Sequence, residues 1–111
     1  MTRASNPAGN QPARKDDIAK PRMDLIPPEA LMALARVLTD GAARYGDRNW
    51  EAGLAWGRVS AALLRHMTAW MAGEETDPDS GMPHSWHVLT NAAFIVAHEA
   101  RDLGTDDRRR A

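Results

Sequence analysis

Polar side chains that can do chemistry are concentrated in the second half of the chain. His84 is followed by His87, Asn91 and His98, at offsets of three, four and seven residues. On a helix this spacing places the four side chains along one narrow stripe of an otherwise apolar surface. Burying such groups without partners would cost about 1 to 3 kcal/mol each. We therefore expect the stripe to meet a metal ion, a phosphate-bearing ligand or other polar side chains.

An acidic stretch, GEETDPDSG, comes directly before this stripe and contains Glu74, Glu75 and Asp77. Glu74 and Asp77 form an E-x-x-D pair, which on a helix places two carboxylates on one face and within reach of one hard cation. Mg²⁺ needs only a few protein carboxylates, because water and substrate phosphates complete its shell. The three acids are therefore candidate metal ligands. The alternative is a solvated loop, with His84 and His87 capping or packing the next helix.

Two further segments carry groups suited to a nucleotide. Arg65 and His66 stand side by side in the sequence; the arginine fork binds phosphate, and the imidazole carries protons or ligates a metal. As structural residues they would be a surface arginine and a hydrogen-bonded core histidine. Upstream, the stretch ARYGDRNW can stack a base and clamp phosphates, or it can cap one end of a helical bundle. Its candidate residues are Arg44, Tyr45, Asn49 and Trp50.

Helices must position these groups, because helical periodicity dominates and little in the chain indicates a strand. The first helix is expected to begin at the Pro27-Pro28-Glu29 signal, where proline and a glutamate suit a first turn. The second is expected at about 58–72, with His66 and Trp70 turned inward, and the third at about 83–103, with an apolar centre. The fold class is all-α, a small bundle of about three main helices. Its core is modest, so we expect self-association to complete it.

Composition sets further bounds on the chain. Of its 111 residues 43% are hydrophobic and 26% charged, with a formal net charge of −1, which gives no electrostatic reason for binding nucleic-acid polymers or membranes. Cysteine is absent, so disulfides and thiolate-bound metals are excluded. Without a membrane-spanning run or a signal-peptide core, we expect a cytoplasmic protein. Polar residues 1–19 and 104–111 are expected to be flexible tails around one domain, 20–103.

Taken together, the sequences KPRMDLIPPEAL, GAARYGDRNWEAG and LLRHMTAWMAGEETDPDSGMPHSWHVLTNAAFI resemble the phage and bacterial dATP/dGTP diphosphohydrolase family. Members of that family are associated with the all-α MazG-like nucleotide pyrophosphohydrolases. The resemblance spans about residues 20–97 and rests on the combination of K-P-R-x-D-L-I-P, Y-G-x-R-N-W, R-H and S-G-x-x-H-x-x-H-x-x-x-N. It implies an enzyme, dimeric or larger, that uses Mg²⁺ to remove pyrophosphate from a purine deoxynucleoside triphosphate.

The resemblance also implies roles for the candidate residues. Glu74, Glu75 and Asp77 would hold Mg²⁺ against the phosphates. His66, His84 and His87 would carry protons or add ligands. The substrate contacts would come from Arg44 and Arg65 to phosphate, Tyr45 or Trp50 to the base, and Asn49 and Asn91 as further polar contacts.

One feature departs from the MazG pattern. Those enzymes carry an E-x-x-E ahead of the E-x-x-D, and no E-x-x-E precedes Glu74 here. Two alternatives therefore stay open: a noncatalytic phage protein that binds a nucleotide or signalling molecule, and a polar stripe that only closes a helical oligomer. The catalytic hypothesis requires the second helix, the acidic turn and the third helix to meet at one solvent-reachable hollow.

Overall fold

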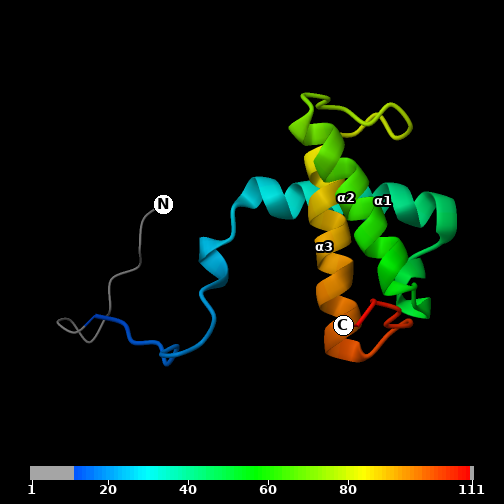
Figure 1. The fold of residues 1–111 in the computed structure, drawn as a ribbon. Coiled ribbons are helices and arrows are strands. Elements are labelled where there is room, and N and C mark those ends of the chain that lie inside the picture. Colours follow the sequence, from blue (N-terminus) through cyan, green and yellow to red (C-terminus); the bar gives the residue numbers. More distant parts are fainter. Residues whose placement is uncertain (1–11, 111) are drawn as a thin grey trace.

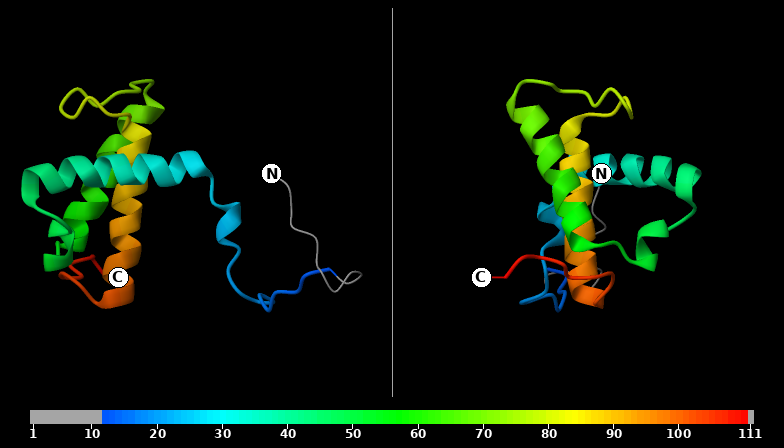
Figure 2. Two further views of the ribbon diagram at one scale, coloured as in Figure 1. Left: turned by 180° about the vertical axis from the view of Figure 1, so that it is seen from behind. Right: turned by 45° about the vertical axis from the view of Figure 1, so that its right-hand side comes forward.

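Three helices form the body of the protein in the computed structural model, which describes residues 12–110. They are α1 (Pro28–Tyr45), α2 (Trp56–Met71) and α3 (His84–Arg101), and no strand occurs within the described range. Short 3-10 helices, η1 (Met23–Leu25) and η2 (Asn49–Ala52), precede α1 and α2. Helices α2 and α3 lie side by side, and α1 crosses them (Figures 1 and 2). The predicted all-α class is confirmed.

Each helix begins and ends where the local sequence favours it. Pro28 occupies the first turn of α1, and Gly46 ends that helix at a φ of +94°. Helix α3 follows Pro83, and the backbone N–H of its first residue, His84, donates to the carbonyl of Glu75 at 2.8 Å. The Glu75 carbonyl in the loop before α3 therefore gives the first N–H group of the helix the acceptor that it lacks within the helix. This bond also fixes where His84 begins the helix.

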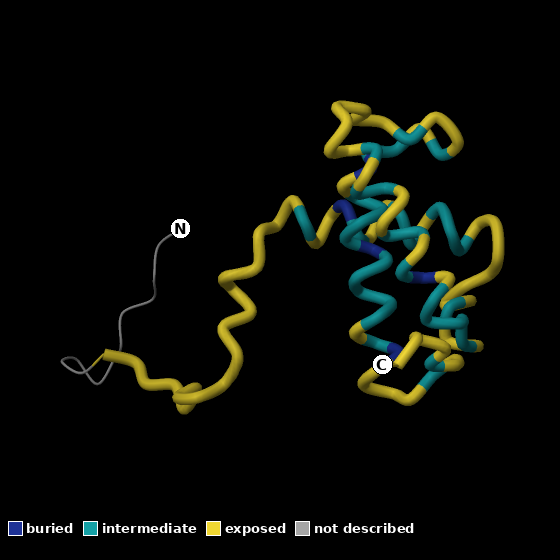
Figure 3. Tube along the Cα trace, in the orientation of Figure 1, coloured by how far each residue is buried: buried dark blue, intermediate teal, exposed yellow. Residues whose placement is uncertain are grey.

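The core is small and partly polar (Figure 3). Within residues 12–110, Ala33 and Val59 are the only apolar residues that are fully buried, at 5% and 4% exposure. The other buried residues are His84, Thr90 and His98. The prediction that Trp70 turns inward was wrong, since Trp70 is 54% exposed in the last turn of α2. The loop 72–83 follows that turn, where a further helix would be needed to cover the Trp70 side chain.

The segment after α3 is attached to the start of α2, whereas the sequence predicted a detached tail from residue 104. Trp56 donates its backbone N–H to Thr105 O at 3.0 Å and its indole N–H to Leu103 O at 2.9 Å. The N–H of Gly57 donates to the Asp107 carboxylate at 2.7 Å. These acceptors explain the attachment, because the first N–H groups of a helix have no partner within the helix.

At the other end, residues 12–27 extend from the bundle as an exposed arm (Figures 1 and 3). The tail predicted for residues 1–19 falls mostly on residues 1–11, which lie outside the described range. Residues 12–19 are exposed and contain no helix. None of the helices described has an apolar run long enough to cross a bilayer.

A candidate histidine site at one end of the α2–α3 pair

Three histidines meet where α2, the loop 72–83 and the start of α3 come together; we call His66, His84 and His87 the histidine cluster. The Nδ1 atoms of His66 and His84 are 2.8 Å apart. The rings of His66 and His87 are stacked, with centroids 4.4 Å apart and planes 18° apart. His84 is buried, and the other two rings are half-buried. The structure thus joins the second helix and the third at these residues.

The acidic stretch reaches the cluster as a folded loop. Helix α2 ends at Met71, so Glu74 and Asp77 do not share a helical face, and the helical reading of the E-x-x-D spacing was wrong. The loop instead closes on itself, with Asp77 N donating to Met82 O at 2.9 Å and Gly81 N donating to Asp77 O at 2.8 Å. Gly81 has a φ of +74°, a conformation that suits glycine.

Each of two carboxylates serves a different histidine. Glu74 Oε1 lies 2.7 Å from His84 Nε2. Asp77 Oδ2 lies 3.7 Å from His87 Nε2, and the Ser80 hydroxyl oxygen lies 2.7 Å from the same ring nitrogen. The loop therefore adds hydrogen-bonding groups to the cluster from one side.

The predicted metal ligands do not form one group. Glu75 is exposed, and its contact with the site is the backbone carbonyl that accepts from His84. Glu74 is engaged by His84, and Asp77 accepts the backbone N–H of Asp79 at 3.2 Å. Across residues 12–110, no three histidine, aspartate or glutamate side chains are arranged to hold a metal ion. The described side chains therefore do not form a three-ligand metal site.

The environment keeps two of the histidines neutral near pH 7. Burial lowers the pKa of His66 below its ordinary 6.5, because a charged ring loses solvation there, and the positive charge of a protonated His87 lowers it further. Burial likewise lowers the pKa of His87, although the negative charge of Asp77 opposes this. For Asp77, burial acts to raise the pKa, but hydrogen bonds from Asp79 N–H and Ser80 and the nearby imidazoles lower it below 3.8. A neutral imidazole pair thus faces an ionised carboxylate.

Several predicted substrate-binding residues surround this cluster. Arg65 is exposed on α2, next to His66 in the sequence. Arg44, on α1, pairs with Asp40 at 3.2 Å, and the charges of both residues act on the pKa of His87. The Asn91 side chain bonds within α3, since its amide nitrogen donates to His87 O at 2.8 Å.

Trp50 and His98 lie together at the far end of α3. The Trp50 ring is 5.8 Å from the Phe94 ring and 6.4 Å from that of His98, with the Arg101 guanidinium over it at 5.1 Å. His98 comes 14 residues after His84 (98 − 84), which is roughly 21 Å along a helix axis. The structure therefore does not bring Trp50 to the histidine cluster. Tyr45 and Asn49 are exposed in and after the last turn of α1.

His98 has a structural role rather than a place in the site. It is 1% exposed. Its Nε2 accepts the backbone N–H of Leu54 at 3.1 Å, and its Nδ1 donates to Phe94 O at 2.7 Å. Nε2 therefore joins α3 to the segment before α2, whereas Nδ1 holds the ring against the preceding turn of α3 itself. The helical stripe predicted from the sequence therefore contains two histidines of the cluster, His84 and His87, and one structural histidine, His98.

Two residues that act on the site were not among the candidates from the sequence. Ser80 approaches His87 from the loop, and Asp40 affects its pKa from α1. Ser80 stands in the S-G-x-x-H pattern, so its place before the histidines was a usable signal. Asp40 and Arg44 are four residues apart on a helix, a spacing that favours an ion pair.

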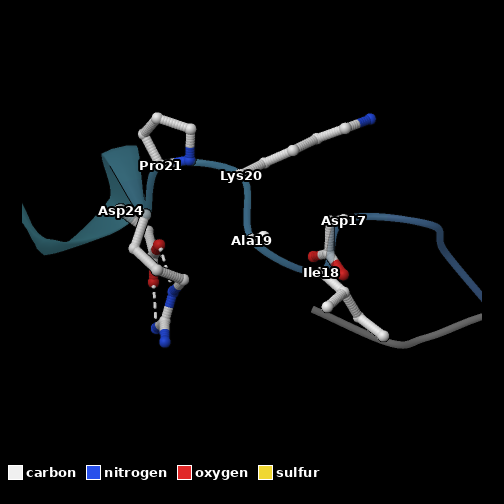
Figure 4. Close-up of a pocket in the computed structure, with 7 residues that line it drawn as sticks. Asp17, Ile18, Ala19, Lys20, Pro21 and Asp24 are labelled. Atoms are coloured by element: carbon white, nitrogen blue, oxygen red, sulfur yellow. Dashed lines mark hydrogen bonds and ion pairs between the residues drawn. The ribbon is translucent and has the colours of Figure 1, made fainter.

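A shallow hollow on the exposed arm is separate from this site (Figure 4). Its lining comes from a single local segment, residues 17–22 together with Asp24. Arg22 forms a two-bond ion pair with Asp24, at 2.8 and 2.7 Å. None of the residues predicted to bind substrate or metal lines it.

Comparison with known proteins places the chain in a family. Residues 10–108 match the model of a family described as "dATP/dGTP diphosphohydrolase, N-terminal". A protein of Salmonella phage PMBT28 named dATP/dGTP diphosphohydrolase is 33% identical over 95 residues, which cover 86% of this chain and 32% of that protein. The chain thus spans about a third of the length of that relative. No solved structure was found to match. The match over nearly the whole chain shows that it belongs to the dATP/dGTP diphosphohydrolase N-terminal family.

Proposed function

We propose that the protein hydrolyses a purine deoxynucleoside triphosphate to the monophosphate and pyrophosphate, with the histidine cluster as the reaction centre. One observation carries this proposal: three histidines and two carboxylates from α2, the loop and α3 gather at one end of the helix pair. The cluster lies within the residues that match the family, and the name of the phage relative supplies the substrate class. Neutral imidazoles that accept protons near pH 7 suit the activation of a water molecule.

Two arginines are the proposed phosphate contacts. Arg65 neighbours His66 on α2, and Arg44 acts on His87 from α1. Both side chains belong to exposed residues, so a triphosphate can replace the solvent around them. Guanidinium groups bind phosphate oxygens in a two-pronged geometry. For the purine base we propose Tyr45, which is next to Arg44 in the sequence and is 68% exposed. We do not assign this role to Trp50, because its ring packs against Phe94.

Magnesium, in this proposal, arrives with the nucleotide rather than from a resident protein site. The described side chains form no group of three ligands, and Mg²⁺ is well satisfied by phosphate oxygens and water. Its contribution would be to offset negative charge on the phosphates. The residues of the chain bind and orient the nucleotide and accept the proton of water.

Nucleotide turnover tests the proposed function. Each of the common ribo- and deoxyribonucleoside triphosphates is incubated with the folded protein, with and without Mg²⁺, and the products are separated by chromatography. We expect monophosphate and pyrophosphate from dATP or dGTP. Binding of a nucleotide that is recovered unchanged would support instead the noncatalytic binding protein, and the absence of both product and binding would reject the site.

A further inference from the structure

We propose that His66 acts as the general base through its Nε2 atom, and that His84 and Glu74 are positioning residues that hold His66 in the required tautomer. The inference rests on the proposed function for the identity of the reaction. It adds the atom that accepts the proton, and it gives Glu74 a role other than metal binding. Two hydrogen bonds in series support it.

The first bond fixes the proton on His84. Glu74 Oε1 is 2.7 Å from His84 Nε2. An ionised carboxylate can only accept hydrogen bonds, so the proton of this bond belongs to Nε2 of His84. A neutral imidazole carries one N–H, and its other nitrogen is an acceptor. Nδ1 of a neutral His84 is therefore an acceptor.

The second bond fixes the proton on His66. Its Nδ1 lies 2.8 Å from Nδ1 of His84. When His84 is neutral it accepts at this position, so His66 must donate, and the single proton of a neutral His66 is held on Nδ1. The free electron pair of the ring is then on Nε2. Glu74, two bonds away, thus determines which nitrogen of His66 is basic.

That nitrogen is not fully enclosed by the protein. No described residue forms a hydrogen bond with Nε2 of His66, and no buried side-chain nitrogen or oxygen in the described part of the chain lacks a partner. Nε2 is therefore not a buried atom. The ring is held in place by the stacked His87 ring, at 4.4 Å between centroids. A water molecule can approach the edge of a ring whose face and opposite edge are already fixed.

The surrounding charges favour the neutral ring that this role needs. Burial lowers the pKa of His66, and the rings of His87 and His84 and the Arg65 guanidinium lower it further. Among the described residues that act on His66, the Asp77 carboxylate raises this pKa. Near pH 7 the ring is then unprotonated and ready to accept a proton.

His87 is held by the loop rather than by a histidine and a glutamate. Its Nε2 lies 2.7 Å from Ser80 Oγ, and because the single proton of Ser80 is donated to Asp77, His87 supplies the proton of this contact. Asp77 approaches the same nitrogen, at 3.7 Å. In a nucleophile-histidine-acid triad the serine and the acid bind opposite ring nitrogens, so Ser80, His87 and Asp77 do not form one. Ser80 also accepts the Met82 N–H at 3.1 Å, which indicates that it shapes the loop.

The reaction step then balances as follows. Water gives one proton to His66 Nε2 while its oxygen forms a bond to the α-phosphorus. The bond from that phosphorus to the bridging oxygen breaks, and its electron pair leaves with pyrophosphate. The imidazolium of His66 faces His84 and, through it, the negative charge of Glu74, as an orienting acid stabilises the imidazolium of a catalytic triad. The proton passes from His66 to solvent, which restores the base.

Two measurements test this inference, and one of them does not need activity. ¹⁵N NMR of protein labelled in its histidines reports which ring nitrogen carries the proton, with signals assigned by comparison with His66→Gln and His84→Gln variants. We expect a proton on Nδ1 of His66 and on Nε2 of His84. In Glu74→Gln the amide both donates and accepts, so His66 should become a mixture of tautomers. A proton on Nε2 of His66 in the unaltered protein overturns the inference.

The second measurement is the split between kcat and KM. Glu74→Gln should lower kcat about 10-fold or more with KM nearly unchanged, because Glu74 acts on the base and not on the substrate. The matched control is Asp79→Asn, an exposed acid of the same loop whose backbone rather than side chain bonds to Asp77. It should leave kcat unchanged. Equal kcat for Glu74→Gln and the unaltered protein overturns the role of Glu74. If the unaltered protein turns over no nucleotide, the proposed function and the base role fail, whereas the NMR result decides the tautomer separately.

Discussion

Two stacked histidines link the stability of the fold to pH. The pKa values of His66 and His87 are lowered in the folded protein, chiefly by burial, so the unfolded chain binds more protons than the folded one below the ordinary value of 6.5. Their stabilising contribution is fully present above pH 6.5 and is lost as the pH falls through the folded pKa values. We expect the free energy of unfolding to decrease from pH 7 towards pH 5.

Denaturant titrations at a series of pH values measure this effect. The decrease between pH 7 and 5 should be smaller in His66→Gln and in His87→Gln, because glutamine does not titrate. The pKa of Asp77 lies below 3.8, so the loss that comes from Asp77 occurs at lower pH and can be separated. An identical pH dependence in all three proteins would contradict the assignment.

His98 differs from the clustered histidines, because its ring serves only the fold. In His98→Leu, the Leu54 N–H loses its acceptor in a buried place, and we expect a loss of about 1 to 3 kcal/mol in the free energy of unfolding. Thermal or denaturant unfolding measures it. Below the melting temperature, kcat/KM should stay within a few-fold of the unaltered protein. A large loss of kcat/KM in a fully folded variant would show that His98 belongs to the site.

Among the secondary-structure elements, the attachment of the C-terminal segment to α2 depends on Gly104. Its φ is +70°, and a Cβ atom at this position would collide with the carbonyl oxygen of Leu54. Gly104→Ala should therefore destabilise the fold by about 1 to 3 kcal/mol. Gly41→Ala is the matched control, because Gly41 lies within α1 and the Cβ that alanine would add there has no neighbouring atom within 4 Å. That change should instead stabilise by about 0.5 to 1 kcal/mol.

Melting curves followed by circular dichroism compare the two variants. We predict opposite shifts in Tm, downward for Gly104→Ala and upward for Gly41→Ala. Equal Tm values for Gly104→Ala and the unaltered protein would show that residues 103–107 do not hold the start of α2.

The helices followed from the sequence, whereas the contacts between them did not. Apolar spacing and the prolines predicted where α1 begins and both ends of α3 to within about two residues, because these signals are local, whereas Gly41 and Gly46 left the end of α1 open. Two things depended on tertiary placement instead: which histidines meet, and which acid each of them binds. His84 and His98 share one helical stripe, yet one joins Glu74 and the other joins Leu54. The loop between Met71 and His84 brings Glu74 to His84, and the spacing of apolar residues does not predict the conformation of a loop.

Taken as a whole, the described chain leaves much apolar surface uncovered. Leu31, Leu64, Trp70 and Val96 are 62%, 61%, 54% and 65% exposed, whereas only two apolar residues in the described part are fully buried. A core this small gives little hydrophobic stabilisation to a single copy. We therefore propose that copies of this chain associate and cover these side chains. This proposal is the self-association that the sequence led us to expect.

Light scattering after size exclusion, over a range of protein concentrations, tests the association. We expect a mass of at least twice the 12.2 kDa of one chain. The double variant Leu31→Glu and Leu64→Glu should increase the monomer fraction, because charged groups oppose burial at an interface. A folded monomer at every concentration would contradict the proposal.

Turnover of dATP and dGTP by His66→Gln decides whether the histidine cluster is a reaction centre. We predict that the unaltered protein forms monophosphate and pyrophosphate, and that the variant, folded by circular dichroism, loses about 10²- to 10⁴-fold in kcat, the usual contribution of a general base. An unaltered protein that forms no product, or a His66→Gln variant that is as active as the unaltered protein, would contradict it.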